Sequence, residues 1–374
     1  MSNARGRSTP AVSVILPVYN AARFLQEALR SLQDQTFEDF EVLAVDDGST
    51  DLSRDILLQF AGEDERFQVL VQENRGAAAA RNLAIHAARA PLLALADADD
   101  VSLPARFHLQ TARFAADPDL AVLGTGAGVI DEDGALCALS LLPPAHEAIE
   151  DALLRGHSLY NPSVMLRTAA VRAVGAYRSH LRYGEDYDLF LRMLPARFAN
   201  LDRALVLYRL HSTQTTQRSM VNTAFAARVI LESRRSESSS RPDPIDSWSG
   251  TPEMPIVCAV SRSEGAELQL CADLLSVIRR GSGADDPVDL SDKLAHRAMQ
   301  LAAEGFDAGD LQHPDRVVSV GLQLWKGGSR WAATLYLLRL VQNAPAVTLR
   351  SFAGNLRRPL LRGPSTERHE KGIG

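Results

Sequence analysis

The sequence predicts an α/β protein with a mostly parallel sheet that is covered by helices on both faces. In the first hundred residues, short apolar runs alternate four times with helical patterns, and such alternation is typical of parallel strands joined by right-handed crossovers. The apolar runs are continuous, as expected for strands buried on both faces. The composition, 46% hydrophobic and 23% charged, is that of an ordinary globular protein.

The first four strands are expected at the apolar runs that begin at Val12, Glu41, Phe67 and Pro91. The first run ends at Pro17, which begins a loop. Helical patterns follow through Leu32, Phe60 and Ala88, and the third of these helices begins after Gly76. No Gly-x-Gly-x-x-Gly follows the first strand, so the usual dinucleotide fingerprint is absent.

The next part of the chain is expected to carry antiparallel strands. We expect helices at 103–114 and 148–154, strands at 121–123, 128–130, 161–167 and 204–208, and a turn at Asp133-Gly134. The glycine-rich stretch 124–128 lacks the Lys-Ser/Thr and the following helix of a phosphate loop. It is therefore expected to be a flexible connection.

The 374 residues exceed the usual size of one domain, so two are expected. Residues 1–230 are predicted to form a catalytic domain and 256–374 a helical region with a basic tail. Residues 231–255 are rich in Ser, Arg, Pro and Gly, which predicts a flexible linker.

Charge and cysteine content narrow the class of protein. A net charge of -6 argues against nucleic-acid binding, and three widely spaced cysteines predict neither disulfides nor a zinc site. No apolar leader or 18-residue apolar window is present, so a cytoplasmic protein is expected. From His313 onward, the sequence contains ten Lys or Arg residues and only three Asp or Glu residues. The helical pattern 331–341 with this basic tail suits peripheral contact with the inner membrane face, and packing against the catalytic domain is the alternative.

The fourth apolar run stops on three acids, Asp97, Asp99 and Asp100. Carboxylates gathered at a strand end repel one another unless a cation lies among them, and a divalent cation there keeps positions open for phosphate oxygens. The alternative is an acidic cluster at a helix N-terminus, with Ser102 as the cap.

Acids also follow the second strand, at Asp46 and Asp47. A carboxylate there can accept hydrogen bonds from a base or a ribose hydroxyl, and Tyr19 after the first strand offers a face for base stacking, unless it merely covers the sheet edge. A phosphatase loop is excluded because Val45 stands where its nucleophilic aspartate would be. Arg81 either lies on a solvated helix face or points to a phosphate.

Glu185, Asp186 and Asp188 open another helical pattern. Three acids suit the helix dipole, yet a carboxylate at such a position can also act as a general base. A glycosidase pair is disfavoured because a hydrolase has no use for the nucleoside and metal motifs.

Four segments in this order resemble the signature of family 2 inverting glycosyltransferases of the GT-A fold, a Rossmann-like fold: Val-Ser-Val-Ile-Leu-Pro-Val-Tyr-Asn, Val-Asp-Asp-Gly-Ser-Thr-Asp, Asn-Arg-Gly-Ala-Ala-Ala-Ala-Arg-Asn and Ala-Asp-Ala-Asp-Asp. The resemblance covers about residues 10–215. It implies that the first two motifs bind the donor nucleoside through Pro17, Tyr19, Asn20 and Asp47.

The resemblance also implies roles for the later motifs. Asp97 would contact the ribose or phosphate side of the donor, and Asp99 would be the main ligand of Mg²⁺ or Mn²⁺. Asp186 would be the general base, with Glu185 binding the acceptor. His211, in Tyr-Arg-Leu-His, would reach the metal or the diphosphate, although a lone His is more often a packing residue.

The sequence therefore predicts a metal-dependent transferase that moves a sugar from a nucleotide-sugar donor, expected to be a UDP-sugar, to a hydroxyl of a glycan or lipid-linked acceptor. A nucleotidyltransferase is the rival enzyme, but it would need a Gly-rich, Arg-bearing loop after the first strand. A catalytically weak nucleotide-sugar-binding or scaffold protein on the same fold is the alternative from another class.

Overall fold

The computed structural model describes residues 9–155, 159–214, 220–236, 243–251, 253–261, 263–278 and 288–304, together with positions 317, 336, 337 and 340. The chain divides into two compact units. One comprises residues 1–234 and 245–251, and the other 235–244 and 252–374.

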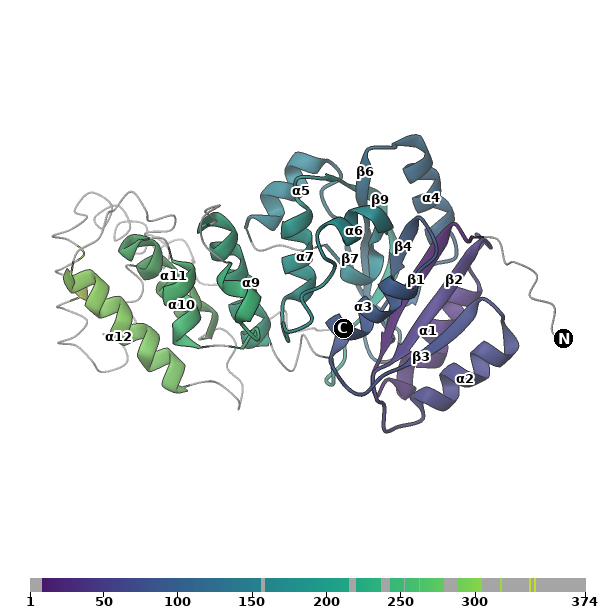
Figure 1. Cartoon of the computed structure of the whole chain (residues 1–374), viewed down its shortest axis with the longest axis horizontal. Coiled ribbons are helices and arrows are strands. Elements are labelled where there is room, and N and C mark those ends of the chain that lie inside the picture. The colour runs from purple at the N-terminus through teal and green to yellow at the C-terminus, as the bar shows by residue number, and fades with distance from the viewer. Residues whose placement is uncertain are drawn as a thin grey trace, which may run out of the picture. The chain divides into compact units, whose positions relative to one another are not determined.

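The first unit is built on one mixed sheet of nine strands (Figure 1). The strands are β1 (Val12–Val18), β2 (Phe40–Asp46), β3 (Phe67–Val71), β4 (Leu92–Leu95), β5 (Val101–Ser102), β6 (Leu120–Ile130), β7 (Leu136–Ser140), β8 (Met165–Arg167) and β9 (Arg197–Arg209). Their order is β3-β2-β1-β4-β8-β6-β9-β5, with β7 paired to β6.

The predicted parallel half is confirmed, because β3, β2, β1 and β4 pair in parallel. The other half is mixed: β8 is antiparallel to β4 and β6, whereas β6 and β9 are parallel. The carboxyl ends of β1, β2 and β4 therefore meet at one edge of the sheet, where open α/β sheets bind ligands.

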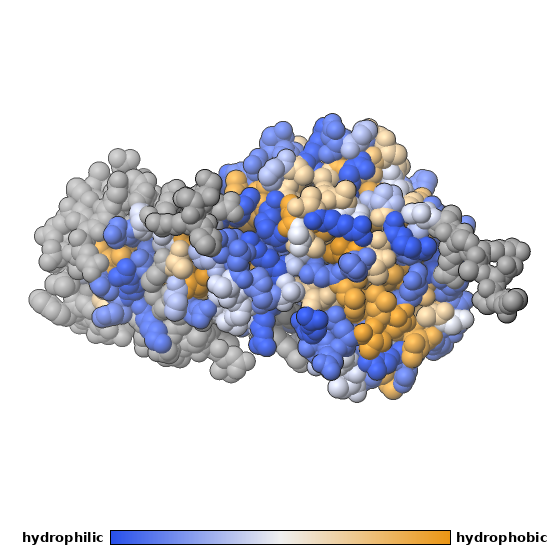
Figure 2. Space-filling view, in the orientation of Figure 1, coloured by the Kyte–Doolittle hydropathy of each residue, from blue (hydrophilic) through white to orange (hydrophobic). Residues whose placement is uncertain are grey.

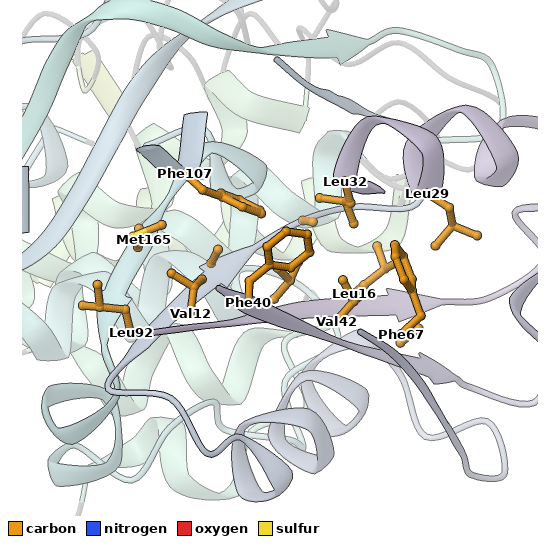
Figure 3. Close-up of a cluster of buried hydrophobic side chains, with 14 of the residues drawn as sticks. Val12, Leu16, Leu29, Leu32, Phe40, Val42, Phe67, Leu92, Phe107 and Met165 are labelled. Carbon is orange, nitrogen blue, oxygen red and sulfur yellow. The ribbon is translucent and has the colours of Figure 1, made fainter. Parts of the chain in front are cut away.

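Helices cover both faces of this sheet. The helices in this part of the chain are α1 (Ala22–Gln33), α2 (Ser53–Glu63), α3 (Ala77–Ala87), α4 (Arg106–Ala116), α5 (His146–Leu153), α6 (Thr168–Ala173), α7 (Glu185–Met193) and α9 (Met220–Ser236), with 3-10 turns η1 (Asn161–Ser163) and η2 (Pro244–Ser247). Figure 3 shows Leu29 and Leu32 of α1 beside Leu16, Phe40 and Val42 of the sheet. Burial of this cluster holds α1, α2 and α4 on one face.

Two strand boundaries differ from the predictions. Pro17 lies inside β1, paired with Val45, rather than in a loop. The nitrogen of Pro17 faces the β4 side of the strand. Because β4 ends at Leu95, opposite Ile15, the missing N–H costs no hydrogen bond of the sheet.

The prediction of a flexible connection at the glycine-rich stretch 124–128 is wrong. This stretch is the buried centre of the single strand β6. A Cβ at Gly124 would collide with the Asn200 side chain, and one at Gly126 would lie 2.6 Å from the Ser140 carbonyl oxygen. These glycines are required because neighbouring chain segments approach closely.

The predicted linker 231–255 is partly packed where it is described. Its first residues belong to α9, which ends at Ser236, and Ile245 and Trp248 are 1% and 2% exposed. These two buried side chains anchor the segment. The Trp248 indole N–H also donates to the Thr251 carbonyl oxygen. The domain boundaries themselves stay predictions.

The second unit is helical in its described part, with α10 (Met254–Val260), α11 (Glu264–Ile278) and α12 (Val288–Glu304). Leu268 and Leu274 of α11 and Leu294 and Leu301 of α12 are fully buried, as the helical periodicity predicts. The predicted basic membrane-contacting segment lies outside the described residues.

No helix in the part of the chain that the structure describes is long and apolar enough to cross a membrane. Most of the coloured surface in Figure 2 is hydrophilic, and an apolar area coincides with the position of edge strand β3 in Figure 1. Val71 at the end of that strand is 53% exposed.

Candidate active site

The residues after β1 and β2 form one hydrogen-bonded loop pair. Asn20 Oδ1 accepts from the Thr50 backbone N–H at 2.8 Å, and Asn20 N–H donates to Ser49 Oγ at 3.1 Å. Asn20 adopts a positive φ of 48°, which asparagine tolerates better than most residues. Tyr19 beside it is 51% exposed, so its ring is open to a ligand.

Asp47 holds the segment that leads into α3. Its Oδ1 accepts from Gln72 Nε2 at 2.7 Å and from the Arg75 N–H at 2.8 Å, and its Oδ2 accepts from the Gly76 N–H at 2.9 Å. Both oxygens thus already have partners within the chain. The predicted contact with the donor nucleoside stays a prediction, but Asp47 shapes the loop from which α3 and Arg81 extend.

Arg81 joins the two acidic motifs. It is 6% exposed, and its Nη2 contacts Asp97 Oδ1 at 3.0 Å while its Nη1 contacts Glu185 Oε1 at 2.9 Å. The solvated helix face is wrong for Arg81, because the guanidinium is buried against two carboxylates. The predicted contact with a donor phosphate stays a prediction. Motifs 88 residues apart are thereby held in one cluster by a buried guanidinium.

Asp186 lies in the same cluster, at the start of α7. Gly184 precedes it with φ 73°, and a Cβ there would lie 3.0 Å from Ile230 Cδ1, so glycine permits the close approach of α9. Asp186 Oδ1 accepts from the Tyr187 N–H at 2.7 Å. Burial raises the pKa of Asp186, and the Arg81 charge opposes that rise.

The pKa of Glu185, beside Asp186, is also raised. Burial, together with repulsion from Asp186, raises the pKa of Glu185 to about 7, although Arg81 acts in the opposite direction. A carboxyl group with such a pKa exchanges protons near neutral pH, as general acid–base chemistry requires.

Asp99 and His211 form a second pair. His211 Nε2 and Asp99 Oδ2 lie 2.8 Å apart, and Nδ1 lies 2.8 Å from Thr213 Oγ1. The ring of His211 packs on Phe24, with centroids 4.9 Å apart. Burial and the neighbouring Asp97 raise the pKa of Asp99, while His211 lowers it. His211 is therefore attached to the acidic motif and is not merely a packing residue.

The alternative of an acidic cluster capping a helix is wrong. Ser102 lies in β5, which pairs with β9, and α4 begins only at Arg106 without a side-chain cap. β5 separates the acids from that helix, whose first turn contains no acidic residue, so the helix dipole does not explain them.

Sequence reasoning missed the residues that brace the acids. Arg209, 2% exposed, donates from Nε to the Asp99 carbonyl oxygen, and its N–H donates to Asp100 Oδ1 at 2.8 Å. Arg106, fully buried, donates to the carbonyl oxygen of Leu95, the last residue of β4. Burial lowers the pKa of Arg106 to about 9. Both arginines looked like ordinary helix or strand residues, because only tertiary contacts reveal their partners.

The donor set fits a dication that is shared with a ligand. Asp97, Asp99 and Asp100 place three carboxylates in mutual electrostatic contact, and His211 adds an imidazole nitrogen. Among the described residues, no group of three or more His, Cys, Asp or Glu side chains is arranged so that it could hold a metal ion by itself. Mg²⁺ is commonly held by one or two carboxylates plus substrate phosphates, so an incomplete protein set is compatible with such a cation.

The structure thus places an acidic cluster at the carboxyl ends of the parallel strands, the edge at which open α/β sheets bind ligands. A model of the family described as Glycosyl transferase family 2 matches residues 13–153. The chain is 32% identical over 234 residues to EpsE of Bacillus subtilis (strain 168), a protein with a glycosyltransferase name. The match covers 61% of this chain and 83% of EpsE. The chain belongs to glycosyltransferase family 2.

Further comparisons agree with this family. The O-antigen biosynthesis glycosyltransferase WbnJ of Escherichia coli is 27% identical over 232 residues, which are 60% of this chain and 90% of WbnJ. The structure of S. aureus TarS 1-349 in complex with UDP-GlcNAc is similar with a TM-score of 0.56 and 15% identity, covering 92% of each chain. At this identity the similarity establishes the fold, and the predicted GT-A fold is confirmed.

Proposed function

We propose that this chain is a metal-dependent inverting glycosyltransferase that moves a sugar from a nucleotide-sugar donor, a UDP-sugar, to a hydroxyl of a glycan or lipid-linked acceptor. The observation that carries this proposal is the Arg81 bridge. It places Asp97, at the end of β4, in one buried cluster with Glu185 and Asp186 at the start of α7.

Asp186 is the general base of the proposed reaction. The acceptor oxygen forms a bond to the anomeric carbon and gives its proton to the Asp186 carboxylate, while the bond from that carbon to the diphosphate oxygen breaks. The nucleoside diphosphate leaves with the bonding electrons. A one-step displacement of this kind inverts the configuration at carbon, and a base of raised pKa suits it.

The donor would lie across the loop pair and the acidic cluster. Pro17, Tyr19, Asn20 and Asp47 are proposed to face the nucleoside, and Asp97 the ribose or phosphate side. Arg81 acts here by holding Asp97 and Glu185 in place, and Glu185 is proposed to contact the acceptor.

Asp99, with His211, is proposed to hold Mg²⁺ or Mn²⁺. Such a cation, when bound, neutralises the negative charge that builds on the departing diphosphate. Burial and the neighbouring Asp97 raise the pKa of Asp99, and a bound cation would favour the ionised form of this carboxylate.

Three further assignments remain proposals. Residues 1–230 would form the catalytic domain, 231–255 a linker and 256–374 a helical region. The protein would work in the cytoplasm, with its basic tail able to contact the inner membrane face if the acceptor is lipid-linked. The name of the relative WbnJ refers to O-antigen biosynthesis, which supports a polysaccharide product.

Titration calorimetry with UDP, with and without Mn²⁺, tests the metal assignment. Asp99→Asn should remove the part of UDP affinity that depends on Mn²⁺. The matched control is Asp119→Asn, since Asp119 is exposed in the turn before β6, and it should bind UDP as wild type does. Equal Mn²⁺-dependent binding by wild type and Asp99→Asn would contradict the assignment.

Donor hydrolysis separates an enzyme from the alternative, a catalytically weak scaffold. Release of free sugar from a panel of nucleotide sugars is measured with and without Mn²⁺. The proposal predicts release that depends on Mn²⁺ and on Asp99. A scaffold would bind a donor and release no sugar under either condition.

A further inference from the structure

Buried polar atoms without hydrogen-bond partners gather at the active site. Six such side-chain atoms occur among the residues that the structure describes. Four of these atoms lie near Asp97, and they belong to Arg81, Asp100, Asn161 and Tyr177. Arg81 and Asn161 hydrogen-bond to Asp97. The Asp97 charge acts on Asp100, and the Tyr177 ring lies against the Arg81 guanidinium. Because buried polar groups in folded proteins are nearly always paired, this concentration indicates groups that a ligand completes.

Asn161 is the residue whose free atom has a defined chemistry. The side chain belongs to η1 and is 8% exposed. Its Nδ2 donates to Asp97 Oδ2 at 3.5 Å, and its Oδ1 has no partner. A flipped amide would set Oδ1 against the Asp97 carboxylate, so the unpaired atom is the carbonyl oxygen, which only accepts.

Tyr160, the neighbour of Asn161 in the chain, packs against a second tyrosine. The rings of Tyr160 and Tyr208 lie 5.6 Å apart, and Gln214 Nε2 donates to the Tyr208 hydroxyl at 2.7 Å. The backbone of η1 is fixed, since the Ser163 N–H donates to the Tyr160 carbonyl oxygen at 2.8 Å. Aromatic surface with a few fixed polar atoms is typical of small-molecule sites.

We propose that Asn161 Oδ1 accepts a hydrogen bond from a hydroxyl of the transferred sugar and so selects the donor. This inference rests on the proposed function. Asn161 contacts Asp97, which Arg81 joins to Glu185, so it lies among the residues assigned to the donor and the acceptor. The anomeric carbon must react between those two groups.

The chemistry of this contact defines the class of sugar. An oxygen that only accepts requires a donor, which a free hydroxyl supplies. A carboxylate of an acidic sugar would instead face Oδ1 and the nearby Asp97 without a proton between them. The site therefore favours neutral sugars with an unsubstituted hydroxyl at the position that meets Asn161.

Titration calorimetry in Mn²⁺ tests the proposal without needing the acceptor. UDP-GlcNAc, UDP-glucose, UDP-galactose and GDP-mannose are each compared with UDP or GDP alone. For the best nucleotide sugar, Asn161→Ala should weaken binding about three- to tenfold, which is the usual effect of one neutral hydrogen bond. Its affinity for the bare nucleoside diphosphate should equal that of wild type.

Asn200→Ala is the matched control. Asn200 is 6% exposed, and its Oδ1 also has no partner, but its Nδ2 donates to the Pro143 carbonyl oxygen and its oxygen packs on Gly124. Loss of the Asn200 side-chain amide should weaken the binding of the nucleotide sugar and of the bare nucleotide by the same small factor, or should leave both affinities unchanged.

Three results overturn the proposal in distinguishable ways. If Asn161→Ala weakens nucleotide sugar and bare nucleotide equally, or neither, the sugar contact is refuted while the proposed function stands. If wild type binds none of the four donors and neither UDP nor GDP in Mn²⁺, the proposed function itself fails. Should Asn161→Ala not fold, wild type is titrated with the monodeoxy analogues of its best sugar, and equal affinity for all of them refutes the contact.

Discussion

The pH dependence of transfer in Arg81→Gln tests how the acidic cluster works. Arg81 contacts Glu185 at 2.9 Å and Asp97 at 3.0 Å from a buried position, and its charge also lowers the pKa of Asp186. The glutamine side chain keeps polar atoms near these carboxylates but removes the positive charge.

The size of the effect follows from Coulomb's law. Unit charges about 4 Å apart attract with about 4 kcal/mol at an effective dielectric constant of about 20, which corresponds to about three pKa units. Water that enters beside the shorter side chain offsets part of this, so we expect an upward shift of about one to two units. Glu185, whose pKa is about 7, would then stay protonated at pH 7.5.

The sign of the change in activity is fixed by the role of Asp186. A general base must be deprotonated, so activity falls below the pKa of the coupled Glu185 and Asp186 pair. In Arg81→Gln the acidic limb of the kcat/KM profile should move to higher pH by about one unit or more, and Arg81→Lys should restore much of it.

Arg89→Gln is the control for the loss of an arginine that pairs with a buried carboxylate. Arg89 contacts Glu41 at 2.7 Å, and Glu41 bonds to Ser13 near the start of β1, at the opposite end of the strands from the acidic cluster. The melting temperature of Arg89→Gln should fall, while the pH profile of its kcat/KM should stay that of wild type. A profile in Arg81→Gln that is lowered uniformly, with an unmoved acidic limb, would refute the electrostatic reasoning.

Two further predictions concern stability. The pKa of Glu185 is about 7 in the folded protein, above its ordinary 4.5, so the folded state holds the extra proton. The free energy of unfolding should therefore fall by up to about 3 kcal/mol as pH rises from 4.5 to 7. Denaturant unfolding at a series of pH values should show a smaller fall in Glu185→Gln. An equal fall in this variant would exclude Glu185 as the source of the pH dependence. Gly124→Ala should destabilise by about 1–3 kcal/mol, because its Cβ meets the Asn200 side chain, whereas Gly62→Ala, with open space near the end of α2, should stabilise by up to about 1 kcal/mol. Equal melting temperatures for the two alanine variants would contradict this packing argument.

The sequence predicted the parallel half of the fold because its signals are local. Continuous apolar runs such as those of β1 and β4 and the helical periodicity of α1 decide their structure within a dozen residues. The acids at the strand ends were likewise visible in the sequence, since parallel strands must bring their carboxyl ends to one edge.

The remainder depends on contacts between distant segments. Gly124 to Gly128 looked like a connection because glycine is rare in strands, and the need for it arises from Asn200 and Ser140, which lie far along the chain. Nothing local distinguished Arg81 from a solvated helix residue, because its partner Glu185 is 104 positions away. Asn161 carried no signal until its unpaired oxygen was seen beside Asp97.

The separation of donor binding from transfer in Asp186→Asn tests the central claim most directly. Calorimetry with the best nucleotide sugar and Mn²⁺ is paired with the rate of sugar transfer, or of donor hydrolysis where no acceptor is supplied. If Asp186 is the general base of a cluster that Arg81 assembles, the donor should bind with nearly wild-type affinity while the rate falls about a hundredfold or more. A variant that transfers sugar at the wild-type rate, or one that loses donor binding as fully as Asp99→Asn, would contradict the account.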